Sequence, residues 1–102
     1  MDVMKGIQKI LEVTRRDSLN LYAQLMLGLG GIESGQYDKA IPRLLKVVNH
    51  DPANLEAILS LGEAYERTGD QASAKKWYTV AKKETNNPDL VNAINERLES
   101  LK

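Results

Sequence analysis

A strip of basic side chains on one predicted helix has the composition of a nucleic-acid-binding surface. It consists of two lysine pairs seven residues apart: Lys75, Lys76, Lys82 and Lys83. Trp77 and Tyr78 lie between the pairs, and basic residues interleaved with aromatic residues can bind RNA. The alternative is a solvated outer helix face with Tyr78 pointing into the core. Glu84 and the neutral total charge favour this alternative, so we expect no nucleic-acid partner.

The residue types in this sequence do not favour a catalytic or a metal-binding site. The sequence has one histidine, His50, and no cysteine. No Asp, Cys or His grouping surrounds His50 in the sequence, so it can neither build a metal site alone nor share a catalytic task. The aspartates Asp38, Asp70 and Asp89 lie at or near predicted helix starts, where carboxylates stabilise exposed N–H groups. We therefore expect no enzyme, no metal site and no cofactor.

A run of glycines at Gly28, Gly30 and Gly31 could suggest a phosphate-binding loop. Such a loop needs a strand before the glycines and a helix N-terminus after them. Here the glycines lie inside a predicted helix, where each costs about 1 kcal/mol relative to alanine. Close approach of a neighbouring helix explains the run better. At Gly31 we expect either that another group fills the space of a large side chain or that the backbone closes up against the helix that opens the chain.

The composition is that of a small water-compatible domain without a strong electric field. Its 102 residues suffice for one core, and 14 basic residues balance 14 acidic ones. This balance excludes overall attraction to nucleic acid or anionic membranes. The longest apolar stretch, 19–32, is interrupted by polar residues and glycines and is shorter than the roughly 20 residues that span a bilayer. Because the sequence has no cysteine, its composition does not indicate an oxidising or a reducing cellular compartment.

Apolar residues recur at spacings of three and four throughout, which predicts an all-α fold. Six antiparallel helices are expected, at about 3–15, 20–34, 38–50, 54–68, 71–84 and 88–101. Gly35 and Gly69 can adopt the left-handed conformation that ends a helix. Pro52 and Pro88 separate further helices, and Asn87 is placed to cap the last one.

Two copies of one pattern, thirty-four residues apart, organise these helices. The first copy contains Leu21, Ala23, Leu25, Leu27, Gly28, Gly35 and Ala40. The second contains Leu55, Ala57, Leu59, Leu61, Gly62, Gly69 and Ala74. A period in this range indicates repeats that bury their apolar faces only by stacking on neighbours. The small residues Gly28, Gly62, Ala40 and Ala74 are expected to let the paired helices cross closely.

This pattern resembles the tetratricopeptide repeat, which implies an α–α superhelix. The resemblance divides 1–102, taken as one domain, into a half-repeat helix (3–15), two repeats (21–54 and 55–88) and a capping helix (88–101). In that register Ile7, Ile10, Leu11 and Val13 form the apolar face of a second helix whose own first helix is missing. We therefore expect a fragment of a longer protein, or a chain that begins with a lone helix.

In tetratricopeptide proteins, the first helices of successive units line a concave groove that holds peptides. The resemblance assigns apolar groove residues in the first repeat: Tyr22, Leu25, Met26 and Leu29. In the second repeat it assigns a mainly acidic set: Glu56, Leu59, Glu63 and Glu66. The family's best-known ligand mode clamps a C-terminal carboxylate with lysine, arginine and asparagine. This chain offers glutamates instead, and they would repel an acidic tail.

The sequence thus predicts a non-catalytic module that binds a protein or peptide with apolar anchors and a basic residue. Two alternatives stay open: a structural tail of a longer solenoid, and a homo-oligomerisation module. The helix at 20–34 is apolar on nearly every side, which is typical of helices buried on more than one face. It is expected either to dock a partner, to pack between its own neighbours, or to form a homodimer through the open N-terminal side.

Overall fold

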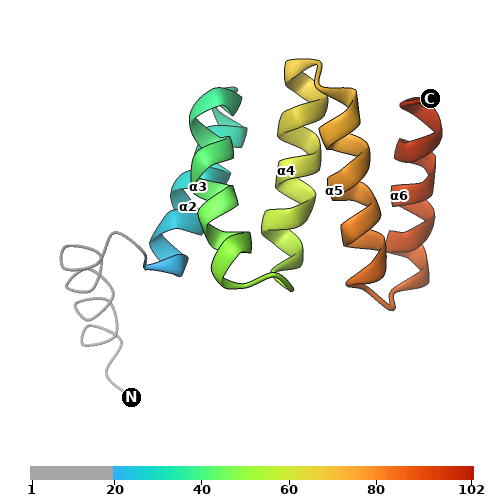
Figure 1. The fold of residues 1–102 in the computed structure, drawn as a ribbon, viewed down its shortest axis with the longest axis horizontal. Helices are drawn as coiled ribbons and strands as arrows, with labels where there is room; N and C mark the ends of the chain where they lie inside the picture. Colours follow the sequence, from blue (N-terminus) through green and yellow to red (C-terminus); the bar gives the residue numbers. More distant parts are fainter. Residues whose placement is uncertain (1–19) are drawn as a thin grey trace.

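The computed structural model describes residues 20–102, which form helices and no strand (Figure 1). The helices are α2 (Leu21–Glu33), α3 (Tyr37–His50), α4 (Leu55–Thr68), α5 (Gln71–Lys83) and α6 (Pro88–Ser100). Each begins and ends within one residue of its predicted bounds. The all-α prediction is confirmed, whereas the helix predicted at 3–15 lies outside the described residues.

Asparagine side chains begin three of these helices. The Asn20 Oδ1 accepts a hydrogen bond from the Ala23 N–H at 2.9 Å, and the Asn54 Oδ1 accepts one from the Ala57 N–H at 3.0 Å. Asn87 caps α6 in the predicted way, with its Oδ1 3.0 Å from the N–H of Asp89. These caps satisfy N–H groups that have no partner inside the helix. The first two caps also lie thirty-four residues apart, as the repeat requires.

In each repeat, one glycine ends the first helix. Gly35 and Gly69 have φ values of +77° and +87°, in the left-handed region that other residues rarely adopt. They allow the chain to reverse within a few residues. Consecutive helices consequently run in opposite directions along the molecule (Figure 1).

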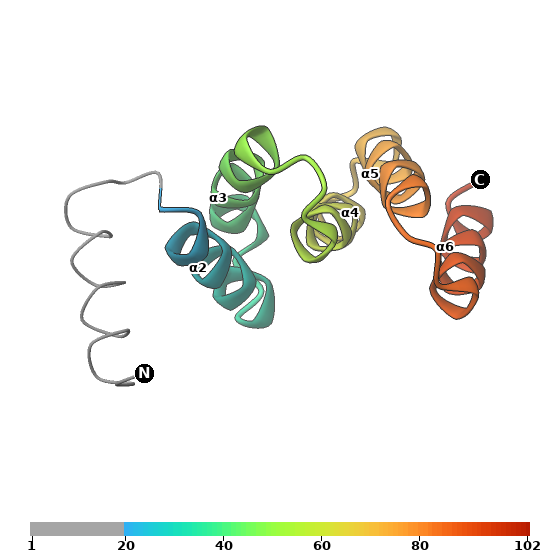
Figure 2. The same ribbon diagram turned by 90° about the horizontal axis from the view of Figure 1, so that it is seen from below.

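The helices form two rows. Seen from below, α2, α4 and α6 lie in one row, and α3 and α5 lie in the other (Figure 2). Each helix packs against the next in sequence, and α2 also contacts α4 across the first repeat. The first helices of successive repeats therefore share one face of the molecule, as the resemblance implied.

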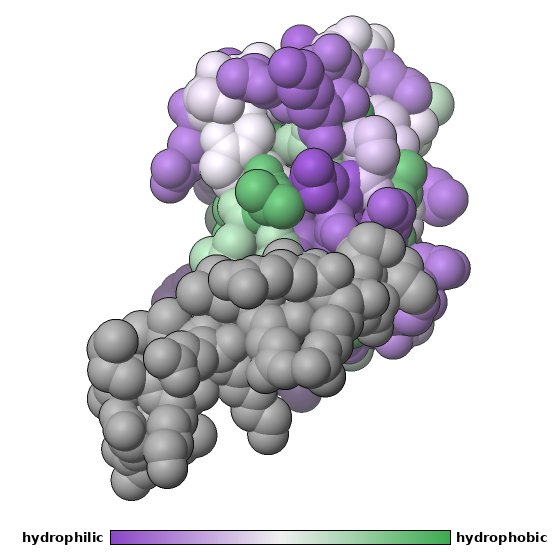
Figure 3. Space-filling model, turned by 90° about the vertical axis from the view of Figure 1, so that its left-hand side faces the viewer, coloured by the Kyte–Doolittle hydropathy of each residue, from purple (hydrophilic) through white to green (hydrophobic). Residues whose placement is uncertain are grey.

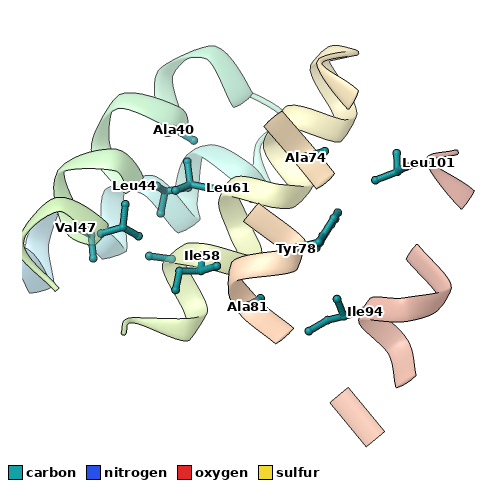
Figure 4. Packing of buried hydrophobic residues seen from close by; sticks show 12 residues of the cluster. Ala40, Leu44, Val47, Ile58, Leu61, Ala74, Tyr78, Ala81, Ile94 and Leu101 are labelled. Carbon is teal, nitrogen blue, oxygen red and sulfur yellow. The ribbon is translucent and has the colours of Figure 1, made fainter. Parts of the chain in front are cut away.

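The core lies between the rows and is continuous from α3 to α6 (Figure 4). Its largest fully buried side chains come from the two central helices: Leu44, Val47, Ile58 and Leu61. Ile94 of α6 and Leu101, which follows this helix, extend the core to the end of the chain's last helix. At about 25 cal/mol per Å² of apolar surface, this shared burial is the main force that holds the repeats together.

Glycines permit the close crossing of the two helices in each repeat. A Cβ added to Gly28 would lie 2.7 Å from the Leu44 Cδ2, and one added to Gly62 would lie 2.7 Å from the Tyr78 Cε1. Both distances are too short for carbon atoms, so the predicted role of these two glycines is confirmed. A Cβ at Gly31 would lie 2.9 Å from that of Ala40. Among the described residues, the helix that approaches Gly31 is therefore α3, and the expected opening helix lies outside them.

Candidate functional site

A hollow of about 250 Å³ lies between α4 and α6 on the row of first helices. We call it the α4–α6 hollow. Its lining residues are Leu59, Glu63, Tyr78, Leu90, Ala93, Ile94 and Arg97. The wall is mainly apolar, and one carboxylate and one guanidinium are the charged groups in it. Such a combination can hold an apolar side chain and orient a charged one.

The charge of Glu66, at the edge of this hollow, is already compensated. The Tyr78 hydroxyl donates a hydrogen bond to its Oε1 at 3.0 Å, and the Arg97 Nη1 lies 3.4 Å from its Oε2. Burial of the Tyr78 ring, together with the hydrogen bond to the Glu66 carboxylate, raises the pKa of the Tyr78 hydroxyl well above its ordinary value. The hydroxyl therefore keeps its proton at neutral pH and donates a hydrogen bond to Glu66.

The other two predicted glutamates are more available for a ligand. Glu56 is exposed and Glu63 is half-buried on the same helix. Within residues 20–102, neither forms an ion pair with a basic side chain. Glu63 lines the α4–α6 hollow, whereas Glu56 does not. The structure thus brings Glu63 and Leu59 together in the hollow's lining, which does not include Glu56.

The four predicted apolar residues of the first repeat lie on α2, outside the α4–α6 hollow. Tyr22 is 56% exposed, and Leu25 is half-buried against the core cluster. Leu29 is also half-buried. Met26, 41% exposed, lines a different depression. A single groove that includes all eight predicted residues stays a prediction.

That second depression is a cleft of about 790 Å³ lined by residues of α2, of α3 and of the turn between them. We call it the α2–α3 cleft. It is lined by Met26, Leu27, Gly30, Gly31, Ser34, Gln36, Asp38, Lys39, Ala40, Pro42, Arg43 and Lys46. On the described part of this end of the molecule, hydrophobic and hydrophilic side chains lie next to each other (Figure 3).

Sequence reasoning missed three residues of α6 that line the α4–α6 hollow. Leu90, Ala93 and Arg97 stand thirty-four residues after Glu56, Leu59 and Glu63. They are the third copies of the predicted groove positions. Extending the repeat register into the helix assigned only as a cap would have found them.

The lysine strip on α5 is partly engaged with its surroundings. The Lys76 Nζ lies 5.0 Å from the centre of the Trp77 ring, which is a cation–π distance. The Lys82 Nζ donates a hydrogen bond to the Asn95 Oδ1 of α6 at 3.1 Å. Tyr78 points into the core, as the solvated-face interpretation requires.

Within residues 20–102, no group of three or more His, Cys, Asp or Glu side chains could hold a metal ion. In the same part of the chain, no helix has the length and apolar character needed to cross a membrane.

Comparison with known proteins agrees with the geometry. The family model of the tetratricopeptide repeat matches residues 31–96, well over half of the chain. No curated protein matches the sequence. The matched range covers α3, α4 and α5 completely, where small residues on one helix meet large ones on the next. Tetratricopeptide repeats are in general non-catalytic modules for protein–protein interaction. With its paired helices, its two-row arrangement and this match, the chain belongs to the tetratricopeptide repeat family.

Proposed function

We propose that this chain is a non-catalytic module that binds a peptide or helix of a partner protein along the row of α2, α4 and α6. The observation that carries the proposal is the α4–α6 hollow, with its apolar wall and the Glu63 carboxylate. The ligand has an apolar anchor that enters the hollow and a basic residue that pairs with Glu63. The exposed Tyr22 offers further apolar contact at the other end of the row.

Charge explains why the ligand is basic and not acidic. Glu66 already interacts with Tyr78 and Arg97, so it adds little attraction of its own. Glu63 and the exposed Glu56 keep this face negative, and like charges facing each other oppose binding. Arg97 opposes this preference less than an unpaired guanidinium would, because it already pairs with Glu66.

A pair of labelled peptides tests the ligand class. One short peptide carries leucine anchors and arginine, and the other carries glutamate in place of arginine. We expect tighter binding of the arginine peptide in fluorescence-anisotropy titrations, with an affinity that falls as salt is added. Tighter binding of the glutamate peptide would overturn the proposal.

Two substitutions locate the site. Ala93→Trp fills the hollow from an exposed position and is expected to weaken binding of the arginine peptide at least tenfold. Glu63→Gln is expected to weaken it about threefold to tenfold, because a partly exposed ion pair contributes about 1 kcal/mol. Glu96→Gln, on the exposed side of α6, is the matched control and should leave the affinity unchanged.

A further inference from the structure

We propose that a hollow between α3 and α5 is a second docking site, which binds an acidic peptide through an apolar anchor. The hollow has a volume of about 600 Å³. Its lining residues are Pro42, Leu45, Lys46, Val48, Asn49 and Trp77. We call it the α3–α5 hollow. It lies on the row of α3 and α5, whereas the peptide proposed above binds along the row of α2, α4 and α6 (Figure 2).

The wall of the α3–α5 hollow presents apolar side chains that the core does not bury completely. Leu45 is 37% exposed, and among residues 20–102 it is the exposed large hydrophobic side chain that lies outside α2. Trp77 is half-buried and packs against the core cluster on one side. Pro42, between them in the lining, is exposed as well. Exposed apolar side chains gathered in a hollow are typical of an interaction site.

The repeated packing of the helices does not require this apolar wall. Thirty-four residues after Leu45 stands Thr79, which donates a hydrogen bond to a carbonyl of its own helix. Thirty-four residues before Trp77 stands Arg43, whose side chain is exposed. A polar residue thus serves at each position in the other repeat. The pair of Leu45 and Trp77 is a feature of the one junction where α3 and α5 lie side by side.

Basic side chains border the apolar wall. Lys46 is exposed and lines the hollow, and the exposed Lys76 has its Nζ 5.0 Å from the centre of the Trp77 ring. Within residues 20–102, neither lysine forms an ion pair with a carboxylate. The lining contains no acidic side chain. Both ammonium groups are therefore available to carboxylates of a ligand.

The surface beside the hollow extends the same charge. The α2–α3 cleft shares Pro42 and Lys46 with the α3–α5 hollow. It adds two basic side chains, Lys39 and Arg43, against one carboxylate, that of Asp38. A peptide that continues from the hollow across Pro42 thus meets a surface that remains basic. This complementarity favours an acidic ligand over a basic one.

The shape of the hollow favours a peptide over a nucleic acid. Single-stranded nucleic acids stack their bases on free aromatic faces. Lys76 already lies over the ring of Trp77, and the other apolar side chains of the lining are aliphatic. Such a wall suits a leucine side chain better than a base. The neutral total charge also gives no long-range attraction to RNA or to an anionic membrane.

The fluorescence of Trp77 tests the proposal directly, because the chain contains no other tryptophan. The full chain is titrated with a short peptide that carries leucine anchors and glutamate and has no aromatic residue. We expect the Trp77 emission to shift to shorter wavelengths in a saturable way, with an affinity that falls as salt is added. The arginine peptide should leave the emission unchanged, since Trp77 does not line the α4–α6 hollow.

Three substitutions locate the site. Leu45→Glu removes part of the apolar wall and adds a like charge, so it should weaken the glutamate peptide about tenfold. Lys46→Gln should weaken it about threefold, as expected for an exposed ion pair, and it leaves the apolar wall intact. Lys83→Gln, an exposed lysine of α5 outside the lining, is the matched control and should leave the affinity unchanged.

Several results would contradict the proposal. An unchanged Trp77 emission at high concentrations of the glutamate peptide would overturn it, and so would equal shifts with the two peptides. Oligouridylate or phosphatidylserine vesicles that shift the emission at lower concentrations than the peptide would assign the hollow to RNA or to a membrane instead. The anisotropy comparison of the two peptides is repeated with Leu45→Glu, in which the α4–α6 hollow is intact. Either proposal can therefore fail without the other.

Discussion

Both repeats have leucine at one equivalent position, but Leu27 of α2 is largely exposed whereas Leu61 of α4 is fully buried. Four positions of α4 are fully buried: Ala57, Ile58, Leu61 and Ala64. Their counterparts in α2 are Ala23, Gln24, Leu27 and Gly30, of which only Gln24 is buried. Leu27 and Leu61 have the same side chain on the same kind of helix, yet Leu27 is largely exposed. The neighbouring helix, not the helix that carries the residue, thus decides its burial.

The polar residue in this comparison has a partner that the second repeat lacks. Arg43 Nη1 donates a hydrogen bond to the Gln24 Oε1 at 3.1 Å. In the second repeat, Ile58 and Trp77 stand at the corresponding positions. The first repeat thus has a polar pair where the second has two apolar side chains. Exchanging these residues between the repeats tests most directly whether the difference affects stability.

The largest effect is expected from placing the polar residue in the second repeat. Ile58→Gln removes a fully buried apolar side chain and buries an amide without a matching donor, so we expect a loss of about 3–4 kcal/mol of unfolding free energy. Urea denaturation followed by circular dichroism measures this loss. The reverse change, Gln24→Ile, should stay within about 1 kcal/mol of the wild type because the exposed Arg43 can turn to water.

A double variant tests whether a polar partner compensates for the buried amide. Adding Trp77→Arg to Ile58→Gln recreates the pair found in the first repeat and should restore part of the lost stability. If Ile58→Gln were as mild as Gln24→Ile, the two repeats would be energetically equivalent at this position. The contrast between their neighbours would then have no effect on stability.

The helices could be predicted from the sequence because their signals are local. Asn54 and Gly69 cap and end α4 by contacts within a few residues, and spacing alone locates them. The contacts of Glu66 could not be predicted, since they come from Tyr78 and from Arg97, thirty-one residues away on a different helix. The groove residues therefore stay a prediction, and the partners of Glu66 had no local signal in the sequence.

The exposure of α2 could not be predicted from the sequence either. An apolar helix predicts burial but does not say which segment covers it. Met26 and Leu27 were placed correctly on α2, but the repeat pattern treated the two α-hairpins as equivalent. Leu61 is buried where α3 packs on α4 (Figure 4), and within residues 20–102 no helix preceding α2 does the same for Leu27.

An intermediate effect is expected where paired helices cross. Gly62→Ala would place a Cβ 2.7 Å from the stiff Tyr78 ring, so we expect a loss of about 2 kcal/mol. Gly28→Ala meets the more adaptable Leu44 and should lose about 1 kcal/mol. Thermal unfolding measures both.

Gly30→Ala is the matched control for these two changes. An added Cβ at Gly30 meets nothing within 4 Å, and the second repeat has Ala64 at this position. Alanine is a better helix former than glycine, so this variant should gain about 0.5–1 kcal/mol. A loss at Gly30 as large as that at Gly62 would show that the crossing distance is not what the glycines provide.

A further small effect concerns the hydroxyl of Tyr78, a group that its first-repeat counterpart, Leu44, lacks. Tyr78→Phe removes the hydrogen bond to Glu66 and keeps the ring, so we expect a loss of about 1 kcal/mol at pH 7. Tyr22→Phe, at an exposed position, is the control and should change nothing. Urea denaturation at neutral pH compares the two.

The pH dependence of this effect has a defined sign. Because folding raises the pKa of the Tyr78 hydroxyl, the folded state holds its proton more tightly than the unfolded state, whose tyrosine pKa is about 10. The hydroxyl's contribution is therefore fully present below pH 10 and is lost as the pH rises above it. Wild type should lose stability between about pH 10 and 11.5 more steeply than Tyr78→Phe. Parallel curves would mean that the Tyr78 proton is not linked to folding, and the second repeat would then differ from the first in shape alone.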